Sequence, residues 1–300
     1  MYNIIVGNLI MKLIETLING LSMGSTYAMI ALGYTMVYGI AKMLNFAHGD
    51  VIMVGGYMLF VTLTATGNPI LGVLAAVVFC VILGVTIEKV AYKPLRGASP
   101  LAVLITAIGV SYLLQSTAQI VFGTAPKMVN IAELGNLNIA GLTIPVYTLV
   151  TLGCSIVIMA TLSIFVKYTK TGRAMIAVSE DKGAAQLMGI NVNKIIMITF
   201  AIGSALAAFA GLFMLMKSPS LTNTLGAMPG IKAFTAAVIG GIGSIPGAML
   251  GGVLMGVVEA ISLTIPVIAP YTDAIEFIIL IIILLVRPTG ILGKKRREKV

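Results

Sequence analysis

KYTKTGRAMIAVSEDKGAAQLMGINVNK, residues Lys167–Lys194, is the longest polar segment between two long apolar runs of the chain. Asp181 is placed to cap a short helix by accepting backbone N–H hydrogen bonds, and Gly189 is placed to end it in the left-handed conformation. Between these caps, one helix face carries three apolar side chains, those of Ala184, Leu187 and Met188. Because such a short helix is marginal in water, we expect it to dock on its own membrane domain or on a second protein. A plain solvated connector between spans is the alternative that spacing leaves open.

The composition around this segment is that of a membrane protein. The chain has 300 residues, of which 59% are hydrophobic and only 10% are charged, and its mean hydropathy is +1.08. A soluble domain of this size cannot bury that much apolar surface. The net charge of +9 does not indicate nucleic acid, because the basic residues lie in short clusters beside apolar runs, as the positive-inside rule expects.

The apolar runs predict an all-α, polytopic membrane protein. Runs long enough to span about 30 Å of hydrocarbon lie at 14–41, 69–88, 101–122, 146–166, 194–216 and 246–265. A shorter run lies at 274–286, with Asp273 and Glu276 at its outer end. The marginal segments 51–66 and 229–242 adjoin polar, glycine-bearing breaks, so we interpret them as parts of discontinuous helices. The count is eight or nine crossings, within a single transmembrane domain over residues 1–300.

The distribution of lysine and arginine predicts the orientation. One arrangement of the spans places 15 of the 19 basic residues on one side, which is then the cytoplasm. It predicts an external N-terminus, a cytoplasmic C-terminus with the basic tail 287–300, and a cytoplasmic loop 167–194.

Polar residues follow the first span, in the segment MLNFAHGDVIMVGGY. Asn45, His48 and Asp50 lie there between apolar flanks, and hydrocarbon offers such groups no partners. In one interpretation the chain unwinds at Asn45–Gly49 and restarts as a helix at Asp50, so that freed backbone groups hold a solute. In the other, the segment is a plain cytoplasmic turn in which Asp50 caps the next helix and His48 is solvated.

A second break lies in PGIKAFTAAVIGGIGSIPGAMLGGVLMGVVEA, residues 229–260. Gly240, Gly241 and Gly243 interrupt an apolar segment that Pro246 restarts, which predicts a helix-break-helix. Downstream, the spacings Gly247-x-x-x-Gly251 and Gly252-x-x-x-Gly256 permit close contact between helices. A phosphate-binding loop is excluded, because no strand precedes these glycines and no Gly-Lys-Ser/Thr follows them.

Other ionisable residues in the apolar segments are few. Glu259 is positioned to face a water-filled path or to reach the outer interface, and Lys232 and Glu15 are positioned to snorkel. The sequence shows no catalytic constellation, and its single histidine argues against a histidine-rich metal site or proton relay. We therefore expect no enzyme activity, no cofactor and no metal on this chain.

Four groups of motifs together resemble the LivH-type permease of bacterial branched-chain amino acid ABC transporters. They are NGLSMGSTYAMIALGYTMVYGIAKMLNFAHGD, EKVAYKPLRG with LITAIGVSYLLQ, TGRAMIAVSEDKGAAQLMGINVNK, and PGIKAFTAAVIGGIGSIPGAMLGG. The resemblance covers roughly residues 13 to 292, and the motifs are specific jointly rather than singly.

The resemblance implies an inner-membrane subunit that moves leucine, isoleucine or valine by ATP-driven alternating access. It implies as partners a LivM-type permease, two cytoplasmic ATPases that carry ATP and magnesium, and an external binding protein, all working in membrane lipid. The family also contains permeases for urea and amides, and an ion-coupled secondary transporter is a further alternative that the shortage of buried carboxylates disfavours.

The resemblance also implies two sets of site residues. For docking on an ATPase the set is Gly172, Arg173, Glu180, Asp181, Ala184, Ala185, Leu187, Met188 and Gly189. For the translocation path the set is Asn45, Phe46, His48, Gly49, Asp50, Gly240, Gly241 and Gly243. Which solute is moved, and whether the second permease is a different chain or another copy of this one, stay open.

Overall fold

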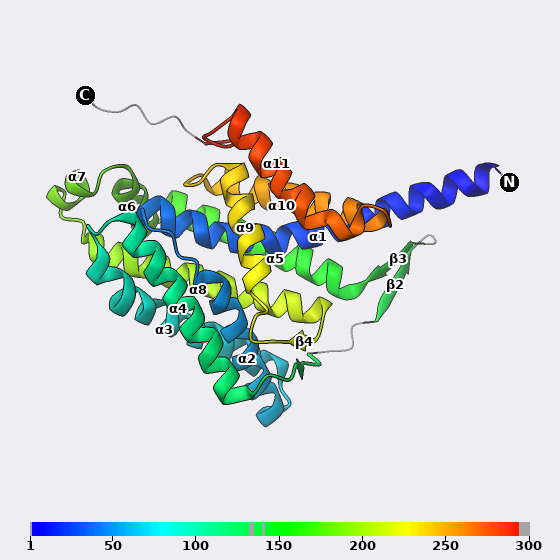
Figure 1. Ribbon diagram of the computed structural model, residues 1–300, viewed down its shortest axis with the longest axis horizontal. Coiled ribbons are helices and arrows are strands. Elements are labelled where there is room, and N and C mark those ends of the chain that lie inside the picture. The colour runs from blue at the N-terminus through cyan, green and yellow to red at the C-terminus, as the bar shows by residue number, and fades with distance from the viewer. Residues whose placement is uncertain (1, 132–134, 140–141, 294–300) are drawn as a thin grey trace.

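Helices make up nearly all of the regular structure, as Figure 1 shows for the computed structural model. The structure describes the backbone of residues 2–131, 135–139 and 142–293, with the side chains of these residues except 2–9 and 139. The helices are α1 (Tyr2–Ala41), α2 (His48–Thr66), α3 (Pro69–Ile87), α4 (Pro100–Phe122), α5 (Val146–Tyr168), α6 (Lys170–Glu180), α7 (Lys182–Leu187), α8 (Val192–Lys217), α9 (Ala227–Gly240), α10 (Ile245–Thr264) and α11 (Thr272–Val286). The predicted basic tail 287–300 is described only as far as Gly293.

Polar side chains fix where many of these helices begin. An oxygen of the residue before the helix accepts a hydrogen bond from a backbone N–H of the first turn, which satisfies a donor that has no partner within the helix. The capping residues are Asn68 for α3, Ser99 for α4, Thr169 for α6, Asp181 for α7, Asn191 for α8 and Ser244 for α10. Proline follows the cap in α3, α4 and α10, where its missing N–H costs nothing.

Seven helical segments of the described chain are long and apolar enough to cross a membrane, and they fall into inner and outer groups. They are α2, α3 with the short turns η1 (Glu88–Tyr92) and η2 (Lys93–Leu95), α4, α5, α8, α10, and α11 with η3 (Ala269–Tyr271). In the most apolar part of α8, 61% of residues are buried, against 17% in α4 and 11% in α11. The outer helices therefore leave most of their apolar surface for lipid or for another protein. The all-α, polytopic fold class is confirmed.

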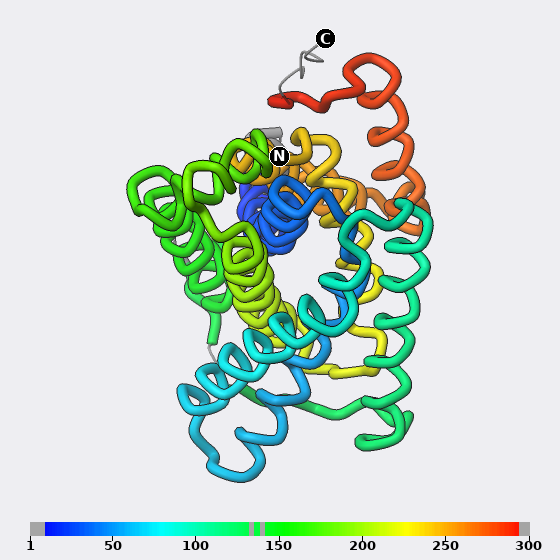
Figure 2. The backbone as a smooth tube through the Cα atoms, turned by 90° about the vertical axis from the view of Figure 1, so that its left-hand side faces the viewer, coloured from blue at the N-terminus to red at the C-terminus, as the bar shows by residue number. Residues whose placement is uncertain are grey.

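Helix α1 runs through the centre of the bundle, with other helices around it (Figure 2). From Tyr27 to Ala41 it is almost entirely buried, although it includes tyrosine, threonine and glycine. Its closest neighbour is α10, whose Gly252 and Gly256 lie directly against the α1 backbone at Ala28 and Gly24. On the other side of α10, Gly247 and Gly251 pack against α9. The predicted close contacts are confirmed, and each glycine pair serves a different neighbour.

The two ends of the bundle differ. Helices α6 and α7 lie at one end, on the left in Figure 1, and the N-terminus and the hairpin of β2 (Asn136–Ile139) and β3 (Leu142–Pro145) lie at the other. A second short antiparallel pair joins β1 (Lys127–Met128) to β4 (Ser220–Leu221). The Glu15 carboxylate is held by the protein: it accepts a hydrogen bond from the Thr143 backbone N–H at 3.1 Å.

Candidate functional site

The chain breaks its helical path between α1 and α2, and the break is folded into the protein. Lys42 takes a left-handed conformation, with φ of 61°, directly after α1 ends. Asn45 is 6% exposed, and its Oδ1 accepts a hydrogen bond from the Tyr92 hydroxyl at 2.9 Å. The Phe46 ring lies 5.4 Å from the ring of Phe234 on α9. The first break is therefore held by side chains from η1 and α9.

His48 and Asp50 are buried, so the interpretation of this segment as a solvated turn is wrong. Each is 2% exposed. Helix α2 begins at His48 rather than at Asp50, and Asp50 caps nothing: its Oδ1 accepts from the Gln115 amide of α4 at 2.8 Å. The His48 ring makes an edge contact with Tyr34, 4.8 Å between centroids. Asp50 thus finds a hydrogen-bond partner inside the protein, as the absence of water in the bilayer requires, whereas His48 Nε2 has none among the described residues.

Gly49 brings the start of α2 against the start of α9. A Cβ on Gly49 would lie 2.5 Å from the carbonyl oxygen of Gly226 and 3.4 Å from the Cα of Gly230. Any larger residue at 49 would push the two backbones apart. The predicted path residue Gly49 is thus a contact between the two discontinuous segments.

The second break joins α9 to α10, and the backbone conformations of its glycines define it. Gly241 and Gly243 have φ of 108° and 94°, conformations that residues with a Cβ rarely adopt. The segment after α11 covers the end of α9, because the N–H groups of Ile291 and Leu292 donate to the carbonyls of Ile239 and Gly240 at 2.8 and 2.9 Å. The predicted helix-break-helix is confirmed. Its exposed carbonyls are occupied by this later segment of the chain.

The fold brings the two breaks together. Leu44 and Asn45 of the first break and Ile242 of the second line one small void, with Tyr34, Tyr38, Phe234 and Ala237 completing its wall. The void is too narrow to admit a water molecule. The two path segments predicted from the sequence therefore meet at this void.

Helices α6 and α7 form the polar segment with which the sequence analysis began. Asp181 caps α7, its Oδ1 accepting from the Ala184 N–H at 3.0 Å, and Gly189 ends the turn with φ of 80°. Both predicted caps are confirmed. Gly172 has no room for a side chain against Phe165 and Val166, which lets α6 fold back on the end of α5.

One side of α7 packs on the protein, and the other side faces solvent. Leu187 and Met188 are 91% and 82% exposed, and Ala184 is exposed beside them. Ala185 is 4% exposed and packs inward, so it holds α7 on its own domain. Arg173, Glu180, Asp181 and Gly189 are also exposed. Two large apolar side chains on a polar tip are unusual unless another surface covers them.

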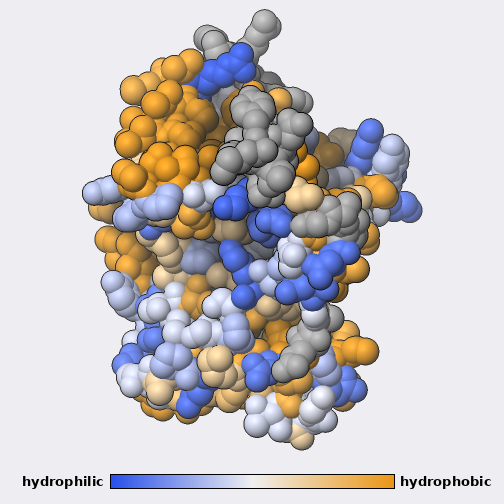
Figure 3. Space-filling model, turned by 90° about the vertical axis from the view of Figure 1, so that its right-hand side faces the viewer, coloured by the Kyte–Doolittle hydropathy of each residue, from blue (hydrophilic) through white to orange (hydrophobic). Residues whose placement is uncertain are grey.

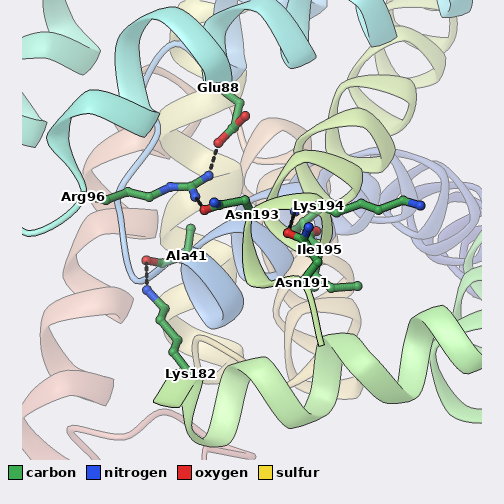
Figure 4. Close-up of polar contacts among 9 residues, drawn as sticks. Ala41, Glu88, Arg96, Lys182, Asn191, Asn193, Lys194 and Ile195 are labelled. Carbon is green, nitrogen blue, oxygen red and sulfur yellow. Dashed lines mark hydrogen bonds and ion pairs between the residues drawn. The ribbon is translucent and has the colours of Figure 1, made fainter. Parts of the chain in front are cut away.

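Two polar links connect this segment to the membrane helices, as Figure 4 shows. The Lys182 ammonium donates to the carbonyl of Ala41, the last residue of α1, at 2.8 Å. Burial and, second, the nearby positive charge of Arg96 lower the pKa of Lys182 below its ordinary value. Arg96 in turn pairs with Glu88 and donates to Asn193, at the start of α8. A displacement of α7 would therefore reach the residue before the first break.

The largest charged cluster was not predicted from the sequence. Lys232 of α9 pairs with Glu259 at 3.1 Å, Asp273 at 2.8 Å and Glu276 at 3.2 Å. The Lys232 side chain is 7% exposed, so the expectation that it snorkels is wrong. The carboxylates come from α10 and α11, 27 to 44 positions along the chain, and no spacing rule links residues that far apart. The only signal was that Lys232 and Glu259 interrupt otherwise apolar segments.

Comparisons with known proteins agree with one another. Residues 16–284 match the family model described as branched-chain amino acid transport system / permease component. The high-affinity branched-chain amino acid transport system permease protein BraD of Pseudomonas aeruginosa is 44% identical, over 96% of this chain and 98% of its own. The corresponding protein LivH of Escherichia coli is 42% identical, over 96% and 97%. A probable branched-chain amino acid transport permease protein LivH of Methanocaldococcus jannaschii is 30% identical over 88% of both chains.

Proposed function

The chain belongs to the family of branched-chain amino acid transport permeases, and from this premise we propose that it is one permease subunit of an ABC importer for leucine, isoleucine and valine. It is a multi-pass protein of the inner membrane. The relatives are permeases and not enzymes, so the energy must come from elsewhere, and we assign ATP hydrolysis to two separate cytoplasmic ATPase subunits with their magnesium.

The observation that carries this proposal is the exposed apolar tip of α7. Leu187 and Met188 project from a basic part of the chain, between Lys182 and Lys194 in the sequence. Fully burying one such side chain stabilises a contact by about 1.5–3 kcal/mol, so a groove that takes both would gain a useful docking energy. A groove on an ATPase fits this tip, in the same way that helix-in-groove complexes use spaced apolar anchors.

The hydrogen bonds between α7 and the membrane helices give the ATPases a way to move the pore. When the ATPases close on ATP, α7 moves with them and carries Lys182, which is bonded to the last residue of α1. The first break follows α1 directly and packs on α9 through Phe46 and Gly49. Opening the closed void between the two breaks then requires that Leu44 and Asn45 of the first break move away from α9. This is alternating access driven from outside the subunit.

The basic residues near α6 and α7 also indicate how the protein is oriented in the membrane. Lys42 follows Ala41, to which Lys182 of α7 is bonded, Lys93 and Lys194 line one cavity, and Arg96 bonds Asn193. Basic residues therefore gather where the tip lies, and the positive-inside rule assigns that end to the cytoplasm. The N-terminus and the β2–β3 hairpin then face outward, toward a substrate-binding protein. A LivM-type permease completes the pore against the exposed apolar helices.

Reconstitution tests the proposal directly. The chain is purified with its membrane and cytosolic partners, inserted in proteoliposomes, and supplied with ATP and either labelled leucine or labelled urea. We expect ATP-dependent uptake of leucine and none of urea. Uptake of urea alone would assign the chain to amide transport, and uptake of leucine by this chain without ATPases would replace the proposal with an ion-coupled transporter.

The tip has its own test. Replacing Leu187 and Met188 together with serine should leave the permease in the membrane but weaken its co-purification with the ATPases and lower uptake. Replacing Ile176 of α6 with serine is a matched control, since it is 46% exposed on the neighbouring helix. Normal uptake in the double variant would refute the docking role.

A further inference from the structure

A basic cavity lies between the turns that end α3 and the start of α8. Its volume is about 290 Å³, and its polar lining residues are Glu88, Lys89, Lys93, Asn191, Asn193 and Lys194. We name it the Lys194 cavity. Asn191 caps α8 just after α7 ends, so the cavity lies at the end of the bundle that carries α6 and α7. None of the site residues predicted from the sequence lines it.

The Lys194 cavity is positively charged. Lys89, Lys93 and Lys194 are exposed, and within the described part of the chain their ammonium groups make no hydrogen bond and no ion pair. The one carboxylate among the lining residues, that of Glu88, is 2% exposed and pairs with Arg96. Because Arg96 already balances this carboxylate, the charges of the three lysines are not neutralised. Three positive charges therefore line one open cavity.

Two asparagines add hydrogen-bond donors to the wall. Asn191 Oδ1 accepts from the Lys194 backbone N–H at 3.0 Å. Asn193 Oδ1 accepts from the Arg96 guanidinium (Figure 4). Because both oxygens are used, these side chains offer the cavity their amide NH₂ groups. The start of α8 also carries the partial positive charge of a helix N-terminus. This set of donors suits an anion with several oxygens, such as a phosphate group.

An exposed apolar row on α3 leads to the cavity. Leu74, Val78 and Ile82 are 56%, 58% and 59% exposed, and they recur four residues apart on one helix face. Lys89 lies about two turns beyond Ile82 on the same face, with Val90 beside it 72% exposed. An apolar row that ends at lysines matches a phospholipid, whose acyl chains lie in the hydrocarbon and whose phosphate lies at the membrane surface. A free phosphate ion would make no use of the row.

We propose that the Lys194 cavity binds the head group of an anionic phospholipid, with Lys89, Lys93 and Lys194 holding the phosphate and the apolar row of α3 holding an acyl chain. The site goes beyond the proposed function, since it assigns a lipid and not a step of transport. In the proposed orientation the cavity faces the cytoplasmic leaflet, where anionic lipids are attracted by basic pockets between membrane helices. The bound lipid would join the end of α3 to the start of α8, beside the Arg96 bonds that already link them.

Native mass spectrometry tests the site by measuring bound lipid. The full-length chain is purified in detergent together with the subunits that it binds, and is mixed with phosphatidylglycerol or with phosphatidylcholine of identical acyl chains. We expect one phosphatidylglycerol to bind at least about tenfold more tightly than phosphatidylcholine. The double variant Lys89→Met with Lys194→Met should lose this preference.

Two further variants separate charge at the cavity from charge in general. Arginine at positions 89 and 194 should retain the preference for phosphatidylglycerol, because the charge is kept. Lys170→Met is the matched control, since Lys170 is exposed on α6 at the same end of the molecule and does not line the cavity. It should bind lipid as the unaltered protein does. Equal binding of the two lipids, or a preference that survives the double methionine variant, would overturn the proposal.

Competition distinguishes a lipid from a soluble phosphate compound. Inorganic phosphate or glycerol 3-phosphate at millimolar concentration should not displace the lipid, because neither has an acyl chain for the apolar row. Displacement by either would assign the cavity to a soluble ligand and overturn the lipid assignment. A carbodiimide cross-link from Lys194 to a cytosolic subunit would overturn it too, in favour of a protein contact. None of these measurements uses transport, so a failure of leucine uptake would refute the proposed function and leave the lipid site standing.

Discussion

The two helix breaks meet at one void but are stabilised in different ways. The first is held by side chains: Asn45 bonds Tyr92, Asp50 bonds Gln115, and His48 packs on Tyr34. The second is held by backbone, with Gly241 and Gly243 in conformations that a Cβ disfavours. The first break is therefore specified by hydrogen-bond chemistry and the second by the absence of side-chain volume.

The difference suggests different tasks. Hydrogen bonds between side chains can be exchanged for others as helices move, and the first break is also the one linked to α7 through Lys182 and Ala41. Close backbone contacts at glycine tolerate little displacement. We infer that the first break moves during transport while the second acts as the fixed point. Three sets of substitutions test this contrast.

The largest effect is expected at the second break. Gly241→Ala would place a Cβ 2.5 Å from the backbone nitrogen of Gly293, at a φ of 108°. Strain of about 1–3 kcal/mol from the backbone, with the collision added to it, should reduce folded protein and uptake by more than about tenfold. Gly109→Ala on α4 is the control, since nothing lies near its Cβ. Fluorescence-detected gel filtration and uptake measure both variants, and equal behaviour would contradict a steric role.

A smaller effect is expected at the first break, and it should be partly reversible. Asn45→Leu leaves the buried Tyr92 hydroxyl with only the long contact to the Leu44 carbonyl at 3.4 Å, at a cost of about 1 kcal/mol, and uptake should fall. Tyr92→Phe should also lower uptake. In the double variant neither partner is left unpaired, so part of the activity should return. Strictly additive losses in the cycle would show that the bond between them does not matter.

The smallest effect is expected at the link between α7 and α1. Lys182→Met removes the hydrogen bond to Ala41 without removing the apolar stem. Because Lys182 is partly exposed, we expect only a few-fold loss of uptake per ATP hydrolysed, with protein yield unchanged. Lys170→Met is the matched control, since Lys170 is exposed and makes no hydrogen bond within the described chain. An unchanged ratio of uptake to hydrolysis in Lys182→Met would remove this link from the mechanism.

Local features could be predicted from the sequence because their causes are local. The Asp181 cap, the left-handed Gly189 and the break at Gly240–Gly243 depend on neighbouring residues, and all three are confirmed. The inward direction of Ala185 could not be predicted, since residues 184 and 185 differ only by the rotation of one step along the helix.

Contacts between residues distant in the chain could not be predicted from the sequence. The bond from Tyr92 to Asn45 and the pairing of Lys232 with three carboxylates depend on how helices pack, which no motif encodes. A cavity lined by Ser22, Met23, Tyr147 and Lys217, at the end of the molecule that Figure 3 views, could not be predicted for the same reason, because α1, α5, α8 and α10 each contribute only part of its wall.

The segment after α11 has a practical consequence for anyone who handles this protein. Ile291 and Leu292 act as a latch on the end of α9, and Gly293 lies against Gly241. Trimming the chain before Ile291 would leave the carbonyl groups of Ile239 and Gly240 without these donors and would loosen the second break. Purification tags and fluorescent fusions therefore belong well beyond Gly293, joined through a flexible spacer.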